Sequence, residues 1–301
     1  MEIEKEIAEF VDTIKKDPFK CYFQNKGNEK VEWEEDKVYV DALYQGYLDA
    51  CRTFKWEKDG KDNKKYIRGI FEEKEIVGNM KNYLSAGKIE SFDEIHKKIC
   101  VNLIEKCEER ISMTYGQAQK IINMAFKYLY CCRHDSAMEE RFKACHMPLD
   151  SFSLEWFKRK FKENDFTNFE RYSAPQKKLP ESLFTQKGEK KKLKAESMGS
   201  WSSMQTWEEG CEKQEYPYEF YTYVIKKYCD ERLITPLQLD FMVWSKIQKI
   251  MAVESFIKTF KADDEEAKKA KKSEKSEAYD INNLKNTLEN RLIEIRPLIC
   301  N

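Results

Sequence analysis

Two side chains in the middle of the chain, Lys120 and Asp150, have the types and surroundings that chemistry could use. Lys120 ends the segment Gly116-Gln117-Ala118-Gln119-Lys120, which follows a tight turn and begins an apolar helix. The N–H groups of such a turn and of a helix amino end can face phosphate. Asp150 comes two residues after Pro148, at the start of another helix. A carboxylate beside a buried amine can tune that amine into a usable nucleophile.

Two stretches, Tyr115-Gly116-Gln117-Ala118-Gln119-Lys120-Ile121-Ile122-Asn123 and Met147-Pro148-Leu149-Asp150, resemble the helix-hairpin-helix/Gly-Pro-Asp DNA glycosylase superfamily. The resemblance covers about residues 112–156. It implies that Lys120 attacks the anomeric carbon of the sugar and forms a Schiff base. It implies that Asp150 assists this attack and stabilises the oxocarbenium-like charge. The target base would be flipped into a pocket and stacked on an aromatic residue.

The chain departs from this family at two points. The hairpin has a single glycine, Gly116, where the family usually has two, and the interval from Lys120 to Asp150 is longer than in most members. A polar insertion at 133–140 would account for the longer interval. Gln119, Asn123 and Lys127 follow one another at helical spacing and share a face. The candidate DNA-binding residues are Tyr115, Gly116, Gln117, Gln119, Asn123, Lys127 and His146.

Simpler interpretations of the same residues stay open. A lysine on an amphipathic helix, such as Lys120, is usually solvated. Asp150 precedes an apolar helix and can serve as its N-cap. Gln117, Gln119 and Asn123 would ordinarily be exposed helix residues, and only their clustering with Lys120 suggests a polar pocket.

A metal site is a further hypothesis, which the spacing of the ligands does not favour. Its residues would be Cys131, Cys132, His134, Cys145 and His146. They match no standard zinc pattern, because adjacent cysteines on a helix point about 100° apart and paired C-x₂₋₄-C elements are missing. Cys145 and His146 are sequence neighbours that rarely face each other, so a nucleophile pair is not expected. We predict no metal and no cofactor.

The periodicity of apolar residues predicts an all-α fold, an irregular multi-helix array with a helix-hairpin-helix-like element and a long loop excursion. No internal repeat and no run of strands is evident. Segment 17–37 is charged and irregular, 133–140 is a polar connection, and 261–278 is an exposed helix or a linker. The expected helices are 2–15, 40–56, 66–85, 91–109, 117–131, one that follows Asp150, 216–229, 235–260 and 280–296.

We expect one continuous fold made of three parts. A helical part with the hairpin element covers 1–162, and a C-terminal helical part that packs on it covers 213–301. Between them, prolines and glycines punctuate 163–212, which we interpret as a loop or lid. The run Lys187–Lys194 within it is a phosphate-contacting loop or a solvated flexible one.

The charges of the whole chain favour no class of partner. Lys+Arg and Asp+Glu number 54 each, so the formal net charge is zero. A nucleic-acid surface must therefore be a local basic patch. The chain shows no secretory signal and no apolar run of membrane-spanning length. Its 10 cysteines mostly occupy apolar helix positions. We expect reduced thiols and a cytoplasmic protein that does not enter a membrane.

Three functional hypotheses follow. The first is a nucleic-acid-acting enzyme of DNA glycosylase/lyase type, with Lys120 as nucleophile and Asp150 as the assisting carboxylate. The second is a non-enzymatic helical interaction or regulatory module, for example in host–phage conflict, that binds a protein partner through its aromatic-rich helices. The third is a helical protein that binds DNA without chemistry.

Overall fold

The structure is a computed structural model. It describes residues 2–14, 33, 35–57, 62–85, 91–132, 134–169, 179–207, 215–270 and 290, and only the backbone of Glu2 and of 258–270. Within these ranges the chain is predominantly α-helical, which confirms the predicted fold class. The elements are α1 (Glu2–Thr13), α2 (Asp36–Ala50), α3 (Asn63–Phe71), α4 (Lys74–Ser85), α5 (Phe92–Cys107), α6 (Tyr115–Tyr130), α7 (Ser136–Phe142), α8 (Ser151–Phe161), β1 (Phe184–Lys187), β2 (Lys190–Leu193), α10 (Tyr218–Asp230) and α11 (Pro236–Ala270). Short 3₁₀-helices are η2 (Cys51–Thr53), η3 (Glu181–Leu183), η4 (Ala195–Met198) and η5 (Trp201–Ser203).

Helix α6 is the centre of the molecule, and every one of its residues is buried. It begins with a capping box, in which the Thr114 hydroxyl accepts from the Gln117 amide and the Gln117 side chain accepts from the Thr114 amide. This pairing stabilises the first turn of a helix. Helices α2 and α5 pack on α6. Because α6 is enclosed on all sides, the polar residues that we expected on an exposed face are buried instead.

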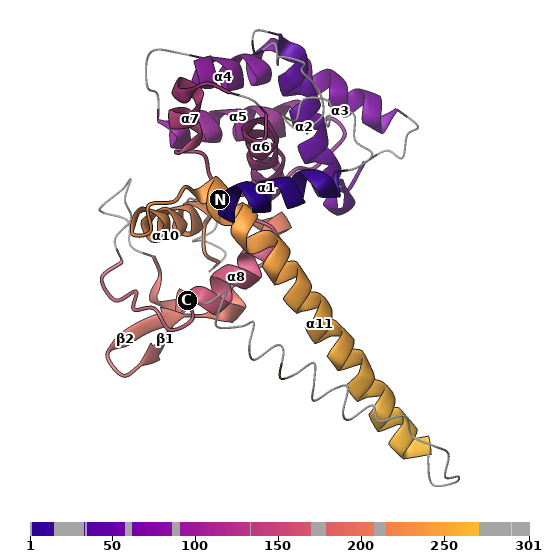
Figure 1. The fold of residues 1–301 in the computed structure, drawn as a ribbon, viewed down its shortest axis with the longest axis vertical. Coiled ribbons are helices and arrows are strands. Elements are labelled where there is room, and N and C mark those ends of the chain that lie inside the picture. Colours follow the sequence, from indigo (N-terminus) through magenta and orange to yellow (C-terminus); the bar gives the residue numbers. More distant parts are fainter. Residues whose placement is uncertain are drawn as a thin grey trace.

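The helices form two groups. Helices α2 to α7, with α6 among them, lie at one end of the molecule, and α8, α10 and the β1–β2 hairpin lie at the other (Figure 1). Helix α1 lies across the middle and packs on α11. One hydrophobic core runs through both groups, from Phe10 of α1 to Ile247 of α11. This continuity agrees with one fold, and the division into 1–162, 163–212 and 213–301 stays a prediction.

The structure corrects three expectations about local structure. The segment 133–140, expected to be a polar connection, contains the start of α7, because Asp135 caps this helix by accepting from the Met138 amide. The single helix expected at 66–85 is two helices, α3 and α4, which meet near residue 73. The excursion 163–212 contains an antiparallel hairpin in which Phe184 pairs with Leu193 and Lys187 with Lys190.

Helix α11 is longer than expected. Its first turn is capped by Thr235, whose hydroxyl accepts from the Gln238 amide, and the helix continues through the charged segment to Ala270. The helix expected at 280–296 lies outside the described residues, apart from Asn290. Among the described residues, no helix is at once long and apolar enough to cross a membrane.

Candidate functional site

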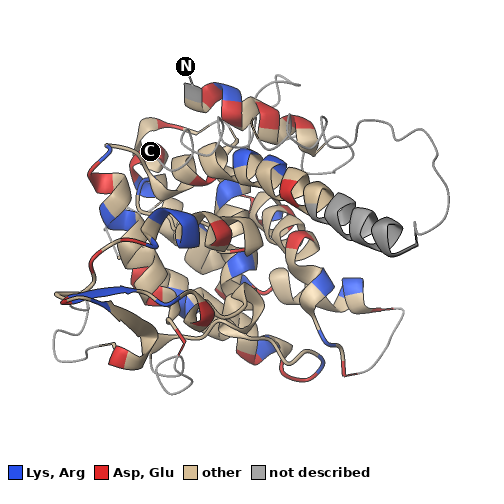
Figure 2. Cartoon of the chain, turned by 90° about the horizontal axis from the view of Figure 1, so that it is seen from below, with Lys and Arg blue, Asp and Glu red and all other residues tan. Residues whose placement is uncertain are grey.

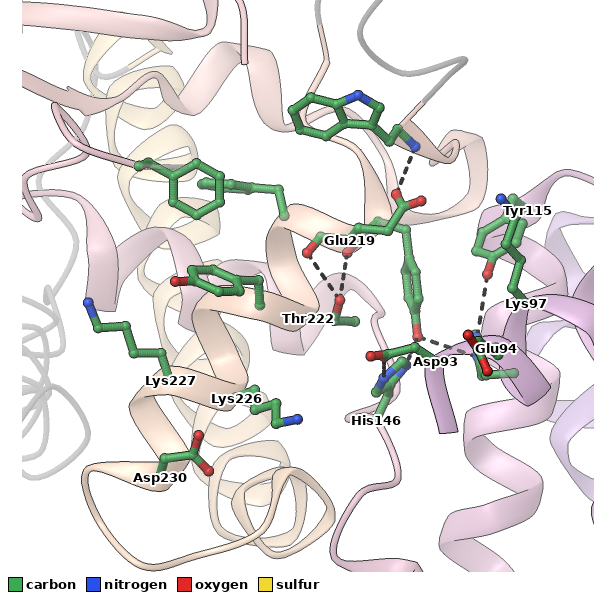
Figure 3. A pocket seen from close by; sticks show the side chains of 16 residues that line it. Asp93, Glu94, Lys97, Tyr115, His146, Glu219, Thr222, Lys226, Lys227 and Asp230 are labelled. Atoms are coloured by element: carbon green, nitrogen blue, oxygen red, sulfur yellow. Dashed lines mark hydrogen bonds and ion pairs between the residues drawn. The ribbon is translucent and has the colours of Figure 1, made fainter. Parts of the chain in front are cut away.

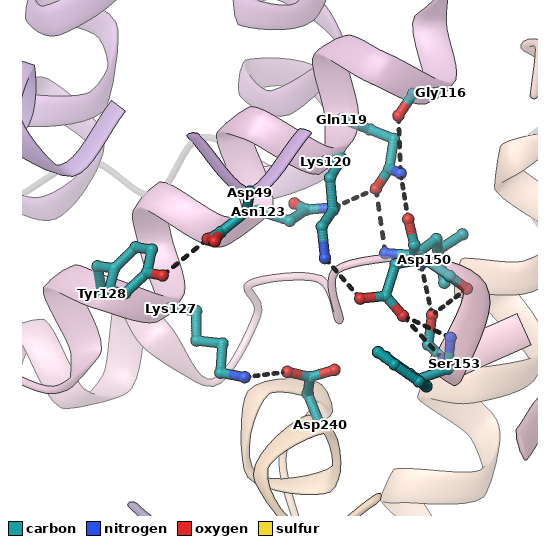
Figure 4. A network of polar contacts seen from close by, with 12 residues as sticks. Asp49, Gly116, Gln119, Lys120, Asn123, Lys127, Tyr128, Asp150, Ser153 and Asp240 are labelled. Atoms are coloured by element: carbon teal, nitrogen blue, oxygen red, sulfur yellow. Dashed lines mark hydrogen bonds and ion pairs between the residues drawn. The ribbon is translucent and has the colours of Figure 1, made fainter. Parts of the chain in front are cut away.

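Lys120 and Asp150 lie in direct contact, although they are thirty positions apart in the sequence. The Lys120 Nζ is 2.6 Å from the Asp150 Oδ2. Both residues are buried, with exposed fractions of 5% and 9%. The interpretation of Lys120 as a solvated lysine is therefore wrong. Figure 4 shows the pair between α6 and the start of α8.

Asp150 also caps α8, which confirms the N-cap interpretation of this residue. Its Oδ1 accepts hydrogen bonds from the amides of Phe152 and Ser153, at 2.9 and 3.0 Å. The Ser153 hydroxyl accepts in turn from the Asp150 amide at 2.6 Å. One carboxylate oxygen thus serves the helix start and the other serves Lys120. Since each oxygen is engaged, the carboxylate is held in one orientation.

The electrostatics of the pair favour its charged form. Burial alone would lower the pKa of Lys120, but the charge and hydrogen bond of Asp150 outweigh it and raise that pKa. Burial would raise the pKa of Asp150, but Lys120 and the helix-start amide of Ser153 outweigh it and lower that pKa. A protonated amine has no free electron pair. In this arrangement Lys120 is an ion-pair partner of Asp150, and its role as a nucleophile stays a prediction.

Gln119 fixes the loop that carries Asp150. Its Nε2 donates to the backbone oxygens of Gly116 and Leu149, at 2.9 and 2.8 Å. Its Oε1 accepts from the Leu149 amide at 3.3 Å and from the Asn123 Nδ2 at 3.0 Å. Helix α6 therefore holds the Pro148–Asp150 loop through the buried Gln119 amide as well as through Lys120 (Figure 4).

The amino end of α6 is covered by the segment of η5. The Gly116 amide donates to the Met204 carbonyl at 2.8 Å, and the Thr114 hydroxyl donates to the Ser202 carbonyl at 2.6 Å. A Cβ at Gly116 would lie 2.0 Å from the Trp201 carbonyl oxygen. The Gln117 Nε2 donates to the Thr53 carbonyl at 2.8 Å. The turn that we expected to face phosphate is thus occupied by the chain itself.

Lys127 belongs to a second buried pair. Its Nζ lies 2.5 Å from the Asp240 Oδ2 of α11 and 3.9 Å and 4.6 Å from the ring centroids of Phe10 and Phe241. Only 1% of Lys127 is exposed. An ammonium over aromatic faces and beside a carboxylate is well compensated. Lys127 therefore joins α6 to α1 and α11, and it does not lie on a DNA-facing surface.

A cavity of about 580 Å³ opens beside this network, between α5 and α10. Two residues of the sequence hypothesis, Tyr115 and His146, lie in its wall (Figure 3). The wall is mainly aromatic and charged, and Lys120 does not line it. Its other lining residues are Asp93, Glu94, His96, Lys97, Phe169, Trp207, Tyr218, Glu219, Phe220, Thr222, Tyr223, Lys226, Lys227 and Asp230. A second cavity of about 540 Å³ shares Asp93, His146, Thr222, Lys226 and Asp230 with it.

A chain of hydrogen bonds joins a carboxylate, an imidazole and a phenol in this wall. The His146 Nε2 lies 2.7 Å from the Asp93 Oδ1, and its Nδ1 lies 2.9 Å from the Tyr218 Oη. The hydrogen bond and charge of His146 lower the pKa of Asp93 to about 2, although partial burial opposes them. The ionised carboxylate only accepts, so Nε2 donates to it. When the imidazole is neutral, Nδ1 carries no proton and accepts from the phenol.

The phenol of Tyr218 is held from two further sides. Asn123 of α6 donates its Nδ2 to the Tyr218 Oη at 2.9 Å. The His96 ring stacks on the Tyr218 ring with centroids 5.3 Å apart and 9° between the planes. Burial raises the pKa of Tyr218 well above its ordinary value and lowers that of His96 well below. The phenol therefore keeps its proton at neutral pH, beside a neutral His96.

The suspected metal ligands do not converge. His134 contacts Glu139 and the Cys132 carbonyl, whereas His146 contacts Asp93 and Tyr218. Among the described residues, no group of three or more His, Cys, Asp or Glu side chains is placed to hold a metal ion. The described cysteines have free thiols, and most of them are buried.

Comparisons of this chain with protein-family models, with curated proteins and with solved structures find no match. The chemistry of the site therefore has to be inferred from its own geometry.

Sequence reasoning missed two members of the hydrogen-bonded chain, Asp93 and Tyr218. Each looked ordinary, Asp93 as a first-turn acid of a helix and Tyr218 as one of several tyrosines in a core helix. The usable signal was that Tyr115 and His146 were candidate DNA-binding residues and that the helix expected at 216–229 is rich in tyrosine. Nothing in the spacing of 93, 146 and 218 shows that they meet.

Proposed function

We propose that the protein acts on nucleic acid, that one nucleotide enters the cavity between α5 and α10, and that Tyr218, His146 and Asp93 form its acid–base group. The observation that carries this proposal is the phenol–imidazole–carboxylate chain, with distances of 2.9 and 2.7 Å, in the wall of a cavity of about 580 Å³. Small-molecule sites usually enclose about 300–1,000 Å³.

The cavity wall supports a nucleotide as the ligand. The aromatic side chains of Tyr115, Phe169 and Tyr223 line it, and aromatic faces stack on any base. Lys226 and Lys227 of α10 are exposed and line the same cavity, where an ammonium can contact phosphate as a point charge. A planar ring and an anionic group are the two parts of a nucleotide.

The hydrogen-bonded chain supports proton transfer to or from that ligand. Tyr218 holds its proton at neutral pH and can donate it to an atom of the bound base. The phenolate that remains takes up a proton from solvent after the product leaves. His146, oriented by the Nε2–H that it donates to Asp93, then accepts again from the phenol through its Nδ1. Asn123 donates to the phenol oxygen and stabilises it while it carries negative charge.

Hydrolytic removal of a base fits this arrangement. The bond between the base and the sugar breaks, water forms the new bond to the sugar carbon and loses a proton to solvent, and the base leaves more readily when a proton reaches it. The experiment is a single-turnover assay of base release from oligonucleotides that carry a panel of damaged and mismatched bases. We expect Tyr218→Phe to abolish release and to leave oligonucleotide affinity within about threefold. The matched control is Tyr221→Phe, which removes another buried phenol, one that donates to the Met198 carbonyl at 2.9 Å. Equal release by wild type and Tyr218→Phe contradicts the proposal.

A lyase that uses Lys120 is a second candidate, favoured by the 2.6 Å contact between Lys120 and Asp150. It requires that the ion pair open and that Lys120 lose its proton when substrate binds. Borohydride trapping on abasic DNA tests it directly. A covalent adduct that disappears in Lys120→Met but persists in Lys127→Met supports the lyase. Absence of an adduct with wild-type protein rejects it, and leaves the acid–base proposal to be judged on base release.

A further inference from the structure

The β1–β2 hairpin and the end of α8 carry a local excess of positive charge. Segments 155–165 and 181–194 hold nine Lys or Arg and five Asp or Glu, in a chain whose formal net charge is zero. Figure 2 shows the basic residues along the hairpin. We call these two segments the basic surface.

The two segments of the basic surface lie against each other. The Phe166 amide, directly after the first segment, donates to the Lys191 carbonyl at 2.9 Å. The Lys192 ammonium contacts the Glu163 carbonyl. Lys187 lies 3.6 Å from the Glu163 carboxylate, with both side chains more than 60% exposed. The basic side chains therefore form one patch. An ion pair as exposed as Lys187–Glu163 neutralises little of the positive charge of this patch.

The hairpin has one buried face and one exposed face. Phe184 pairs with Leu193, and both are buried. Side chains alternate along a strand, so Thr185, Lys187, Lys190 and Lys192 share the opposite, outer face. This face holds three lysines and no apolar side chain.

The lysines of the outer face lower the stability of the hairpin. Lys187 stands directly opposite Lys190, and like charges at opposed positions destabilise a two-stranded ribbon. Lys192 follows on the same face, about 6.7 Å further along the strand. Lys187 and Lys192 contact Glu163, and a polyanion that lies over this face adds further anionic partners for all three ammonium groups.

The basic surface adjoins the cavity through a short aromatic bridge. Phe166 packs on Phe184 of the hairpin, with ring centroids 5.8 Å apart, and on Phe169, at 6.3 Å. Phe169 lines the cavity and packs on Tyr223 of α10 at 5.2 Å. The bridge reaches the inner, buried face of the hairpin, so a strand whose base enters the cavity passes around the hairpin edge to reach the outer face.

We propose that the outer face of the β1–β2 hairpin, through Lys187, Lys190 and Lys192, binds the phosphate backbone of a nucleic acid strand. This inference rests on the proposed function, which supplies nucleic acid as the ligand. It adds the path that the nucleic acid strand takes outside the cavity. An anionic lipid surface would attract the same charges. The outer face has no apolar side chain to insert into a membrane, whereas the neighbouring aromatic cavity suits a base.

The experiment measures the anisotropy of a fluorescein-labelled 20-nucleotide single strand, at several salt concentrations, with the full chain. The test variant is Lys187→Gln/Lys190→Gln/Lys192→Gln. The control variant is Lys64→Gln/Lys65→Gln/Lys74→Gln, which removes the same charge from exposed lysines of α3 and α4. We expect the test variant to lose about tenfold or more in affinity and about 2 units of salt slope, since each phosphate contact on a single strand contributes about 0.7. The control should change affinity less than about threefold.

Three results overturn the inference. One is equal affinity of wild type and test variant, and another is an equal loss in the control. The third is binding to phosphatidylserine vesicles that depends on the three lysines while the oligonucleotide does not bind.

Tyr223→Ala separates this inference from the proposed cavity. If the lysine variant binds normally while Tyr223→Ala weakens binding, the hairpin proposal fails and the cavity stands. If only the lysine variant weakens binding, the hairpin proposal holds and the cavity proposal loses its support.

Discussion

At the scale of single residues, the core of this protein contains buried charged side chains, each of which has one oppositely charged partner in direct contact. Lys120 and Asp150 are both at least 91% buried, and each meets its partner at one short contact of 2.6 Å. Removal of one member of such a pair leaves an uncompensated charge in a medium that solvates it poorly. The pair is therefore strongly coupled, whether or not it also takes part in catalysis.

We expect Lys120→Met to lower the free energy of unfolding by about 3–5 kcal/mol, because it leaves the Asp150 carboxylate buried without an oppositely charged partner. Urea denaturation at pH 7 measures this difference. Lys64→Met, at an exposed position of α3, should change stability by less than about 0.5 kcal/mol. A loss of similar size in both variants would mean that the buried pair contributes no more to the free energy of unfolding than an exposed lysine does.

The same pair predicts a dependence of stability on pH. The folded-state pKa of Asp150 is lowered, because Lys120 outweighs the opposing effect of burial. Its contribution is therefore complete above the unfolded pKa, about 3.9, and is lost as pH falls through the lower folded value. We expect wild type to lose more stability than Asp150→Asn between pH 5 and 3. If the free energies of unfolding of the two proteins, measured by urea denaturation, fall equally between pH 5 and 3, this prediction is contradicted.

At the scale of elements, close backbone contacts position the site. Gly116 lets the η5 segment cross the start of α6, where a Cβ would lie 2.0 Å from the Trp201 carbonyl oxygen. That segment continues to Trp207 in the cavity wall. The glycine thus matters here for the space that it leaves, since its backbone is helical.

We expect Gly116→Ala to destabilise the protein by about 1–3 kcal/mol, through overpacking against a backbone atom. The matched control is Gly78→Ala in α4, where a Cβ would meet nothing within 4 Å. There, alanine should raise stability by about 0.5–1 kcal/mol. Thermal unfolding measures both changes, and a stabilising Gly116→Ala would show that the η5 segment does not lie where we describe it.

The sequence predicted elements better than it predicted the site. Apolar periodicity identified most helices, because burial of one face leaves a local signature in the sequence. The short helix α7 and the hairpin were missed, since their stability comes from a cap at Asp135 and from packing of Phe184 and Leu193 rather than from a long periodic pattern. Asp93, His146 and Tyr218 were not predicted to meet, because three distant helices or loops bring them together.

At the scale of the whole molecule, one junction joins the two groups of helices. Lys127 of α6 contacts Asp240 of α11 and lies over the ring of Phe10 from α1. Phe10 also packs on Phe241 with ring centroids 5.3 Å apart. The first helix of the chain therefore covers a buried charge at the point where the two groups meet.

We expect Phe10→Ala to cost about 3–5 kcal/mol, because it removes a buried ring and admits water to Lys127. Hydrogen exchange should quicken in α1 and at the start of α11 before it does so in α10. Phe256→Ala is the control, since that side chain is 48% exposed, and it should leave exchange unchanged. Uniform quickening throughout the chain would contradict a local junction.

The central claim is that a nucleotide enters the cavity between α5 and α10. The most direct measurement is photo-crosslinking of an oligonucleotide that contains one 5-iodouracil, followed by mass spectrometry of the crosslinked peptides. We predict crosslinks at the aromatic wall residues, foremost Tyr115, Trp207 and Tyr223, and competition by unlabelled strand. Crosslinks confined to α1 to α4, or no specific crosslink at saturating oligonucleotide, would contradict it.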